Sequence, residues 1–445
     1  MNSIESRTMR KILRRFAPLL TICFVVAFLD RVNVGFAALT MNKELGLSAS
    51  TFGLAAGLFF LSYFVFEVPS NMLLERFGAR RWIARIMFTW GLCSGATAFV
   101  QGEWSFYAIR LLLGAAEAGF FPGVVFFLSL WVPASYRARV IGGFMAAMPL
   151  ASVIGSPISG YLMSLHGWMG LSGWQIMFLL EAVPSLILAV IVWNVLRDSP
   201  KQAEWLEDDE RQWLEATLAT ERAALPAVVD QSLMKMLGNP VILFTALAYF
   251  GVTGFNYGLS FFLPQIVRVF DLSIQQIGFV SALPFVAGAA GMIFWGRHSD
   301  RTGERRYHLL LPLTLAAIGL AGSTLIPTPI GKLTLLCVAS FGVFSALPVF
   351  WTVAPRLLGP TAAAAGIALI NSLGNLSGFV NPYVVGRIKD ATGSFNGGLQ
   401  FIAVVGVLAV VILFFVTRLI DTRRNGPAKS VIPSKNDNPL ETTPQ

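Results

Sequence analysis

Long apolar runs fill most of this chain, and each run is about as long as a lipid bilayer is thick. A helix needs about 20 residues to cross the hydrocarbon core. Only 13% of the residues are charged and 55% are hydrophobic, whereas a soluble protein carries about twice that share of charge. We therefore predict an all-α membrane protein with twelve transmembrane helices. The predicted spans are 16–39, 49–72, 82–100, 104–131, 138–164, 174–196, 240–268, 274–296, 308–326, 332–355, 362–386 and 397–420.

Lysine and arginine positions predict the side of the membrane that each loop faces, because cytoplasmic loops carry an excess of these residues. With both termini inside, the cytoplasmic segments hold 26 of the 33 Lys and Arg residues, and the external loops hold 5. The remaining 2 are Arg31 and Arg110, which lie within spans. We expect both termini in the cytoplasm. The net charge of +9 then belongs to a face that meets anionic lipid rather than nucleic acid.

A polar stretch between the sixth and seventh spans divides the chain into two halves. Within it, Trp205, Trp213 and Leu218 recur at helical spacing, opposite a run of acidic residues. This pattern predicts an interfacial helix along the inner membrane face, and a binding site for a regulatory partner is the alternative. The predicted domains are an N-terminal six-helix bundle over 1–196, a cytoplasmic linker over 197–238, a C-terminal six-helix bundle over 239–421 and a disordered cytoplasmic tail over 422–445.

The loop after the second span and the loop after the eighth span share one pattern, offset by 225 residues, in 71–81 and 296–306. Pro157 and Pro382 share the same offset, so we infer an internal duplication. Each copy places an acid and several arginines in a Gly-containing turn, where they could latch the two halves in one state. Simple positive-inside anchoring is the alternative. The predicted gating residues are Glu75, Arg76, Gly78, Arg80 and Arg81 in the first copy, and Gly296, Asp300, Arg301, Gly303, Arg305 and Arg306 in the second.

Four charged residues lie inside apolar spans: Asp30, Arg31, Arg110 and Glu117. A charge left in hydrocarbon costs at least about 2.5 kcal/mol, so such residues normally face a polar cavity. Arginine binds a carboxylate through two parallel hydrogen bonds, and buried acids can exchange protons. We therefore assign proton coupling to the two acids and anion binding to the two arginines. A salt-bridge network that only holds the helices together is the alternative.

Arg110 and Glu117 are seven residues apart, which places them on one helix face about 10 Å apart. Asp30 and Arg31 diverge by about 100°, so only one of them is expected to point along the cavity axis. In the empty carrier the arginines are expected to pair with the two carboxylates. Protonation of the acids from outside would then free an arginine for the substrate.

Other ionisable and sulfur-containing residues receive no transport role. Glu67 and Glu181 are also acids within spans, and we predict a helix-packing role for both. The three cysteines and three histidines show no spacing typical of metal ligands or disulfides. We expect neither a metal nor a cofactor. An enzyme is excluded because no phosphate-binding loop or nucleophile constellation occurs.

The repeated loop resembles the signature of the major facilitator superfamily, although the first copy has Asn71 for the usual Gly and Glu75 for the usual Asp. The strings FLDRVNVGFAAL, RLLLGAAEAGFFPG and GIALINSLGNLSGFVNPY are similar to the anion:cation symporter family, near its bacterial tartrate, phthalate and 4-hydroxyphenylacetate permeases. The resemblance implies two pseudo-symmetric six-helix bundles around a central site. It also implies a multi-pass protein of the bacterial inner membrane, and we expect a monomer.

The resemblance carries over to individual residues. The family's symporters use an acid and an arginine on the first helix and an arginine and an acid on the fourth, which Asp30, Arg31, Arg110 and Glu117 match. A substrate-contacting Tyr and Asn of the family correspond to Tyr63 and Asn375. Met148 stands where sugar-acid carriers have Gln, which argues against a heavily hydroxylated sugar acid. Further polar candidates near mid-membrane, for which helix–helix bonding is the alternative, are Asn256, Tyr257 and Asn371.

These observations predict a secondary active transporter that takes up a small organic carboxylate together with protons. Tartrate and aromatic acids such as phthalate or 4-hydroxyphenylacetate are the expected substrates. The partners are then a small organic anion, the proton and the lipid bilayer, with no nucleic acid. A proton-driven exporter or exchanger of organic anions is the alternative, because arginines within the membrane favour an anion but do not set direction.

Overall fold

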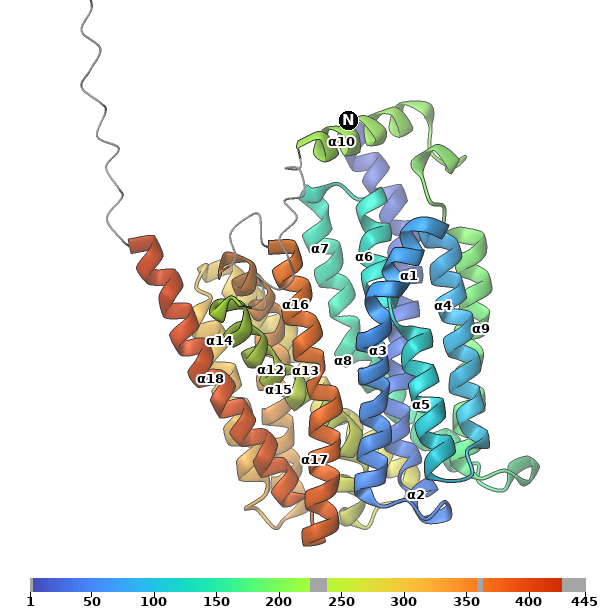
Figure 1. Ribbon diagram of the computed structural model, residues 1–445, viewed down its shortest axis with the longest axis vertical. Helices are drawn as coiled ribbons and strands as arrows, with labels where there is room; N and C mark the ends of the chain where they lie inside the picture. The colour runs from blue at the N-terminus through green and yellow to red at the C-terminus, as the bar shows by residue number, and fades with distance from the viewer. Residues whose placement is uncertain (1–2, 225–237, 358–362, 426–445) are drawn as a thin grey trace, which may run out of the picture.

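The computed structural model describes residues 3–224, 238–357 and 363–425, and these fold into two adjoining helical bundles (Figure 1). The predicted residues 225–237 of the linker and 426–445 of the tail lie outside the described part. The N-terminal bundle contains α1 (Ile4–Ala37), α2 (Met41–Glu44), α3 (Ala49–Phe77), α4 (Ala79–Ala96), α5 (Glu103–Glu117), α6 (Phe120–Trp131), α7 (Ala134–Met145), α8 (Ala147–Met163) and α9 (Gly173–Val195). The C-terminal bundle contains α12 (Pro240–Val267), α13 (Ile274–Thr302), α14 (Arg306–Ser323), α15 (Pro329–Leu357), α16 (Ala363–Asn375), α17 (Ser377–Thr392) and α18 (Asn396–Asn425).

The helices agree with the twelve predicted spans. Among the described residues, nine helical segments are long and apolar enough to cross a membrane. The other predicted spans, 82–100, 308–326 and 362–386, coincide with α4, α14 and the pair α16–α17. The prediction is therefore confirmed in the number and order of the spans.

Three spans that were predicted as continuous are broken near their middle. The fourth is divided into α5 and α6, the fifth into α7 and α8, and the eleventh into α16 and α17. In the fourth span the break lies at Gly119, whose φ of 88° is in the left-handed region that favours glycine. A break frees backbone carbonyl and N–H groups from the helix ladder, and such groups are tolerated at membrane depth where they line a cavity.

The two bundles pack closely at the end where the external loops are predicted. There α3 lies along α17 and α8 lies along α13. Gly160 and Gly278 allow the second pair to touch, because a Cβ on Gly160 would come within 2.9 Å of the Gly278 Cα. Asp390 ties α17 to the other bundle by accepting the Ala49 N–H at 2.9 Å and the Ser50 N–H at 2.8 Å.

The linker forms α10 (Asp208–Ala224), which lies across the end of α1 (Figure 1). A helix was predicted here, but its apolar side chains Leu214 and Leu218 are buried within the protein. Ion pairs fix α10 to α1: Glu210 accepts from Arg7 at 2.9 Å and from Lys11 at 2.9 Å. The helix therefore belongs structurally to the N-terminal bundle.

Candidate functional site

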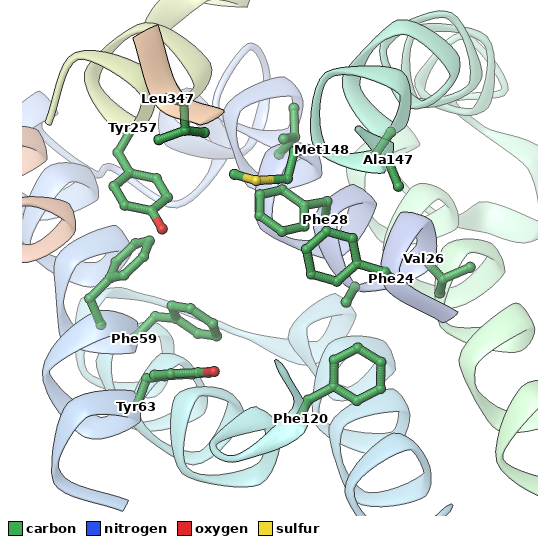
Figure 2. Packing of buried hydrophobic residues seen from close by; sticks show 14 of the residues in the cluster. Phe24, Val26, Phe28, Phe59, Tyr63, Phe120, Ala147, Met148, Tyr257 and Leu347 are labelled. Carbon is green, nitrogen blue, oxygen red and sulfur yellow. The ribbon is translucent and has the colours of Figure 1, made fainter. Parts of the chain in front are cut away.

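A cavity lies between the two bundles, with an empty volume of about 830 Å³ that includes space open to solvent. Its lining comes from α1, α3, α6, α7 and α8 of one bundle and from α12, α15 and α16 of the other. Figure 2 shows the hydroxyl groups of Tyr63 and Tyr257 pointing toward the space that Phe28 and Met148 border. The cavity extends from Arg31 toward Glu67, which is the cytoplasmic direction in the predicted topology. Of the predicted substrate-binding residues, those that line it are Arg31, Tyr63, Asn256, Tyr257, Asn371 and Asn375.

Arg31 and Glu117 form an ion pair at the wall of this cavity. The Nε and Nη2 atoms of Arg31 both donate to Oε1 of Glu117, at 2.8 and 2.5 Å. The Glu117 side chain is 0% exposed, and among the described residues its Oε2 has no hydrogen-bond partner. Since Arg31 lines the cavity and Glu117 lies behind it, the arginine is the group that an entering anion would meet.

Glu117 owes its place to the break in the fourth span. It is the last residue of α5, and the chain turns at Ala118 and Gly119 before α6 begins. The freed carbonyl of Ala118 accepts a hydrogen bond from Ser70 Oγ at 2.6 Å. A side chain on Gly119 would collide with that Ser70 hydroxyl, so the turn packs tightly against α3. The local backbone thus fixes where the carboxylate lies.

Asp30 faces away from the cavity, although it is adjacent to Arg31. Its carboxylate accepts hydrogen bonds from Trp90 Nε1 at 2.5 Å, Ser94 Oγ at 2.9 Å and Asn33 Nδ2 at 3.3 Å. The expectation that the arginines pair with both carboxylates is therefore met for Glu117, whereas Asp30 is held by neutral donors. The divergence of the two neighbours about the helix axis explains why only one reaches the cavity.

Arg110 is buried on α5 beneath the cavity wall rather than in the lining. Its side chain is 1% exposed, and its Nε donates to the Ala55 carbonyl at 3.4 Å. Within the described residues its Nη2 has no partner. The guanidinium lies 4.9 Å from the centre of the Phe59 ring, and that of Arg31 lies 5.4 Å from the same ring. The two arginines therefore border one aromatic side chain, and Arg31 is the one that reaches the cavity.

The C-terminal bundle contributes neutral polar groups. Tyr257 on α12 donates to the side-chain oxygen of Asn375 at 3.3 Å, where α16 ends. Asn256 and Asn371 line the same side of the cavity. Met148 also lines it, near the break between α7 and α8. These amides and hydroxyls can donate or accept hydrogen bonds without adding charge.

Several lining residues were not predicted for the site, and Glu67 and Thr253 are polar ones among them. Glu67 was assigned to helix packing, but it lines the cavity, and the hydrogen bond that it accepts from Ser372 is long, at 3.4 Å. Thr253 also lines the cavity and bridges to the Gly374 carbonyl at 2.8 Å. The spacing Tyr63-x-x-x-Glu67 puts both side chains on one helix face, which is a signal that could have found the acid. Glu181 is buried and bonded to Ser159 at 2.7 Å, as expected of a packing residue.

The predicted gating loops make their described contacts within their own bundles. In the first copy, Asp198 accepts the Arg80 N–H at 2.8 Å and covers Gly78 at the start of α4. In the second copy, Asp300 pairs with Arg305 at 2.8 Å. The latch between the halves thus remains a prediction, since these contacts do not join the bundles.

A histidine pair beside the second gating loop was not expected from sequence. His298 and His308 approach to 2.7 Å between Nδ1 and Nε2, and the Nδ1 of His308 lies 2.6 Å from Glu304. No cluster that could hold a metal ion occurs within the described parts of the chain. The contacts cap the start of α14, because Glu304 also accepts the Tyr307 N–H at 2.7 Å.

Most of this chain is similar to proteins that are already known. The family model described as Major Facilitator Superfamily matches residues 20–382. A protein of Agrobacterium vitis named "Putative tartrate transporter" is 50% identical over 419 residues, covering 94% of this chain and 96% of that protein. A "Quinolone resistance transporter" of Acinetobacter baumannii is 39% identical over 413 residues, covering 93% and 95%. The solved bacterial homologue of the human lysosomal transporter Spinster, inward-facing and unoccupied, has a TM-score of 0.77 at 16% identity, over 96% of this chain and 100% of that one.

Proposed function

This chain belongs to the major facilitator superfamily, and from that premise we propose that it takes up a small organic carboxylate together with protons by alternating access. The membership makes it a multi-pass membrane transporter. We place it in the bacterial inner membrane with both termini in the cytoplasm, as the distribution of basic residues predicts. The substrate passes through the cavity without chemical change, so no catalytic residue is required.

The ion pair between Arg31 and Glu117 carries this proposal. Arg31 is held by Glu117 at 2.5 Å and also lines the cavity. A carboxylate ligand and the Glu117 carboxylate therefore compete for the same guanidinium. Protonation of Glu117 removes its charge and frees Arg31 to bind the substrate in the bidentate manner that arginine favours. Binding of anion and proton are thereby coupled through one residue.

Asp30 is the second proposed proton carrier. Its carboxylate is 2% exposed and is held by neutral donors from α4, so it is not compensated by a direct ion pair in the described contacts. Protonation of Asp30 and Glu117 offsets the charge of the bound anion, which lowers the cost of enclosing the loaded site within the membrane.

The cavity faces the end of the molecule where the gating loops lie, while the bundles are joined at the opposite end by Asp390 and the α8–α13 contact. In the predicted topology this arrangement is open to the cytoplasm. We propose that release of proton and substrate occurs from this state. The bundles then rock about the central site, and the gating loops latch them at the cytoplasmic end.

Relatives support an organic anion as the substrate. The Agrobacterium vitis protein is named for tartrate, a small hydroxylated dicarboxylate. Tartrate and aromatic acids such as phthalate and 4-hydroxyphenylacetate are therefore the proposed candidates. The lining amides Asn256, Asn371 and Asn375 supply groups that could bind a hydroxyl or a second polar substituent.

A proton-driven exporter or exchanger of organic anions is the second candidate. The relative named for quinolone resistance favours it, since resistance to a drug is a property of an export system. The pair Arg31–Glu117 favours binding of anion and proton together, because coupling of two binding events is reciprocal. Export driven by an inward proton gradient would instead require that proton and anion compete for the site, so the direction of net movement under that gradient distinguishes the two candidates.

The test is uptake of labelled tartrate, phthalate and 4-hydroxyphenylacetate into vesicles with and without an inward proton gradient. Accumulation of one anion that a protonophore abolishes is the expected result. Arg31→Gln is expected to abolish it, while Arg110→Gln, which alters a residue outside the lining, tests whether the second arginine also binds substrate. Proton-driven movement only in the outward direction would replace uptake by export, and movement of none of the anions would contradict the proposal.

A further inference from the structure

One wall of the cavity is built from flat or polarisable apolar side chains. Phe24 and Phe28 come from α1, Phe120 and Phe121 from α6, and Met148 from α8. Figure 2 shows Phe24, Phe28, Phe120 and Met148 arranged along the same side of the space. Rings and a thioether of this kind favour contact with a planar ring, through stacked or edge-on arrangements. A polyhydroxylated chain would leave its hydroxyl groups without partners on this wall.

The charges of the lining favour a ligand with one carboxylate. Among the described lining residues, Arg31 is the cation and Glu67 is the acid. A first carboxylate can pair with Arg31. A second carboxylate would find no further lining cation and would approach the Glu67 carboxylate, which is repulsive at short range. Arg110 does not relieve this repulsion by direct contact, because it lies beneath the wall.

The wall opposite the rings offers neutral hydrogen-bonding groups. Asn256, Tyr257 and Asn371 belong to α12 and α16 and line the cavity across from α1 and α6. An amide binds a hydroxyl or carbonyl substituent at little electrostatic cost. A ligand with a carboxylate at one end, a flat ring in the middle and one polar substituent at the other end satisfies all the walls together.

We propose that the carried anion is an aromatic monocarboxylate with a polar ring substituent, and that dicarboxylates such as tartrate are poor ligands. This inference rests on the proposed function, because it names the substrate class of the same site. It differs from what the names of similar proteins suggest. The proposal rests on the aromatic wall and on Arg31 as the one cation among the described lining residues, and the names of similar proteins indicate neither feature.

The test is equilibrium competition on the purified full chain, with labelled 4-hydroxyphenylacetate as the probe and four unlabelled competitors. Benzoate is matched with cyclohexanecarboxylate for ring flatness, and with phthalate for the second carboxylate. Tartrate is the fourth competitor. We expect benzoate to compete at least about tenfold better than either of its matched analogues, and 4-hydroxyphenylacetate to bind more tightly than tartrate by a similar factor, as one lost contact of this type changes affinity.

Three variants test which wall of the cavity causes each of these differences in affinity. Glu67→Gln is expected to reduce the ratio of the affinities for benzoate and phthalate at least threefold, because it removes the repulsive charge. Phe121→Leu is expected to weaken 4-hydroxyphenylacetate and benzoate but not cyclohexanecarboxylate. Phe279→Leu, which changes a side chain that is 65% exposed on α13, is the matched control and should change nothing.

The outcomes separate this inference from the proposed function. The inference is supported if the protein binds aromatic monocarboxylates more tightly than dicarboxylates and if Glu67→Gln brings the affinity for phthalate closer to that for benzoate. This holds whether or not a proton gradient drives their accumulation. Tighter binding of tartrate than of 4-hydroxyphenylacetate, together with proton-driven uptake of tartrate, would overturn the inference and leave the function standing. Failure of every carboxylate to bind or move would overturn both.

Discussion

Arg31 and Glu117 are 86 residues apart in the chain, and both hydrogen bonds between them end on one carboxylate oxygen. The other oxygen, Oε2, is buried and has no partner among the described residues. A buried polar atom without a partner is costly, so this oxygen is a natural place for a proton. In this ion pair, Oε1 of Glu117 therefore binds Arg31, while Oε2 is free to take up a proton.

Glu117→Gln is predicted to abolish uphill accumulation while leaving exchange of the substrate across the membrane. Glutamine has the shape of protonated Glu but cannot release a proton, so Arg31 stays free in every state. The steady-state accumulation ratio in vesicles with an inward proton gradient should fall to about one, while counterflow of labelled against unlabelled substrate persists. Glu181→Gln is the control, because Glu181 is a buried acid bonded to Ser159 outside the cavity lining. Full proton-driven accumulation by Glu117→Gln would remove Glu117 from the coupling step.

Asp390→Asn is predicted to favour the state that is open at the external end. The Asp390 carboxylate caps the start of α3 in the opposite bundle through the N–H groups of Ala49 and Ser50. A negative charge at a helix N-terminus contributes about 0.3–1 kcal/mol, and charged hydrogen bonds add to it. Loss of about 1 kcal/mol from one state changes the ratio of the two states about fivefold.

The measurement is labelling from outside by a membrane-impermeant maleimide at Ser152→Cys, in a background without native cysteines. Ser152 lies in a small space on the far side of Arg31 from the main cavity. Its labelling rate should rise about fivefold when Asp390→Asn is added. Glu103→Gln, at the start of α5, removes a charge from a predicted external loop and serves as the control. An unchanged rate would show that Asp390 does not hold the bundles together.

The spans and the pairing of Arg31 with Glu117 could be predicted from the sequence, whereas the breaks within the spans could not. Apolar residues predominate on both sides of Gly119, so the hydrophobic run by itself gives no sign that the helix ends at Glu117. The break follows from a positive φ and from packing against Ser70, which is distant in sequence. Apolar composition indicates that a segment lies within the membrane, whereas the position of a helix end depends on the backbone conformation of a single residue.

The same limit applies to the orientation of charged side chains. Adjacent residues on a helix were expected to diverge, but sequence could not say whether Asp30 or Arg31 would face the cavity. The answer depends on Trp90 and Ser94, donors on α4 that lie 60 and 64 residues away. The aromatic wall was missed for a related reason, because Phe and Met in a span are equally suited to lipid, core or cavity.

The contact between α10 and α1 is predicted to depend on pH in the acidic range. Burial tends to raise the pKa of the Glu210 carboxyl, but hydrogen bonds from Lys11 and from the Glu207 backbone N–H outweigh it and lower the pKa. A lowered pKa in the docked state means that docking is stabilised above the ordinary Glu pKa of about 4.3 and loses this contribution as the pH falls through the lowered value. The contact should therefore be complete at pH 5 and above.

Hydrogen exchange of the α10 amides checks this expectation. Their protection, corrected for the intrinsic rate, should stay constant from pH 7 to about pH 5 and decrease below about pH 4. Glu210→Gln should lose protection at neutral pH and show a smaller acid-dependent step than the wild type, because Asp209 and Glu207 still pair with Arg7 and Lys11. Glu204→Gln, which changes an exposed acid before α10, is the matched control. Protection of the wild-type helix that is unaffected at pH 3 would contradict the assigned role of Glu210.

Gly119→Ala is predicted to damage both the fold and the coupling site. Alanine must adopt a φ near 88°, which is strained, and its Cβ would collide with the Ser70 hydroxyl. Gly167→Ala provides the matched control, because Gly167 also has a positive φ, of 92°, but nothing lies within 4 Å of its added Cβ. Backbone strain alone costs about 1–2 kcal/mol, so the control measures that part and the difference between variants measures the collision.

Thermal unfolding in detergent should show a clearly lower midpoint for Gly119→Ala than for Gly167→Ala. Its folded fraction should also transport poorly, since Glu117 lies two residues from the displaced turn and would lose its register with Arg31. Equal midpoints with normal proton-driven uptake in both variants would show that the turn tolerates a side chain.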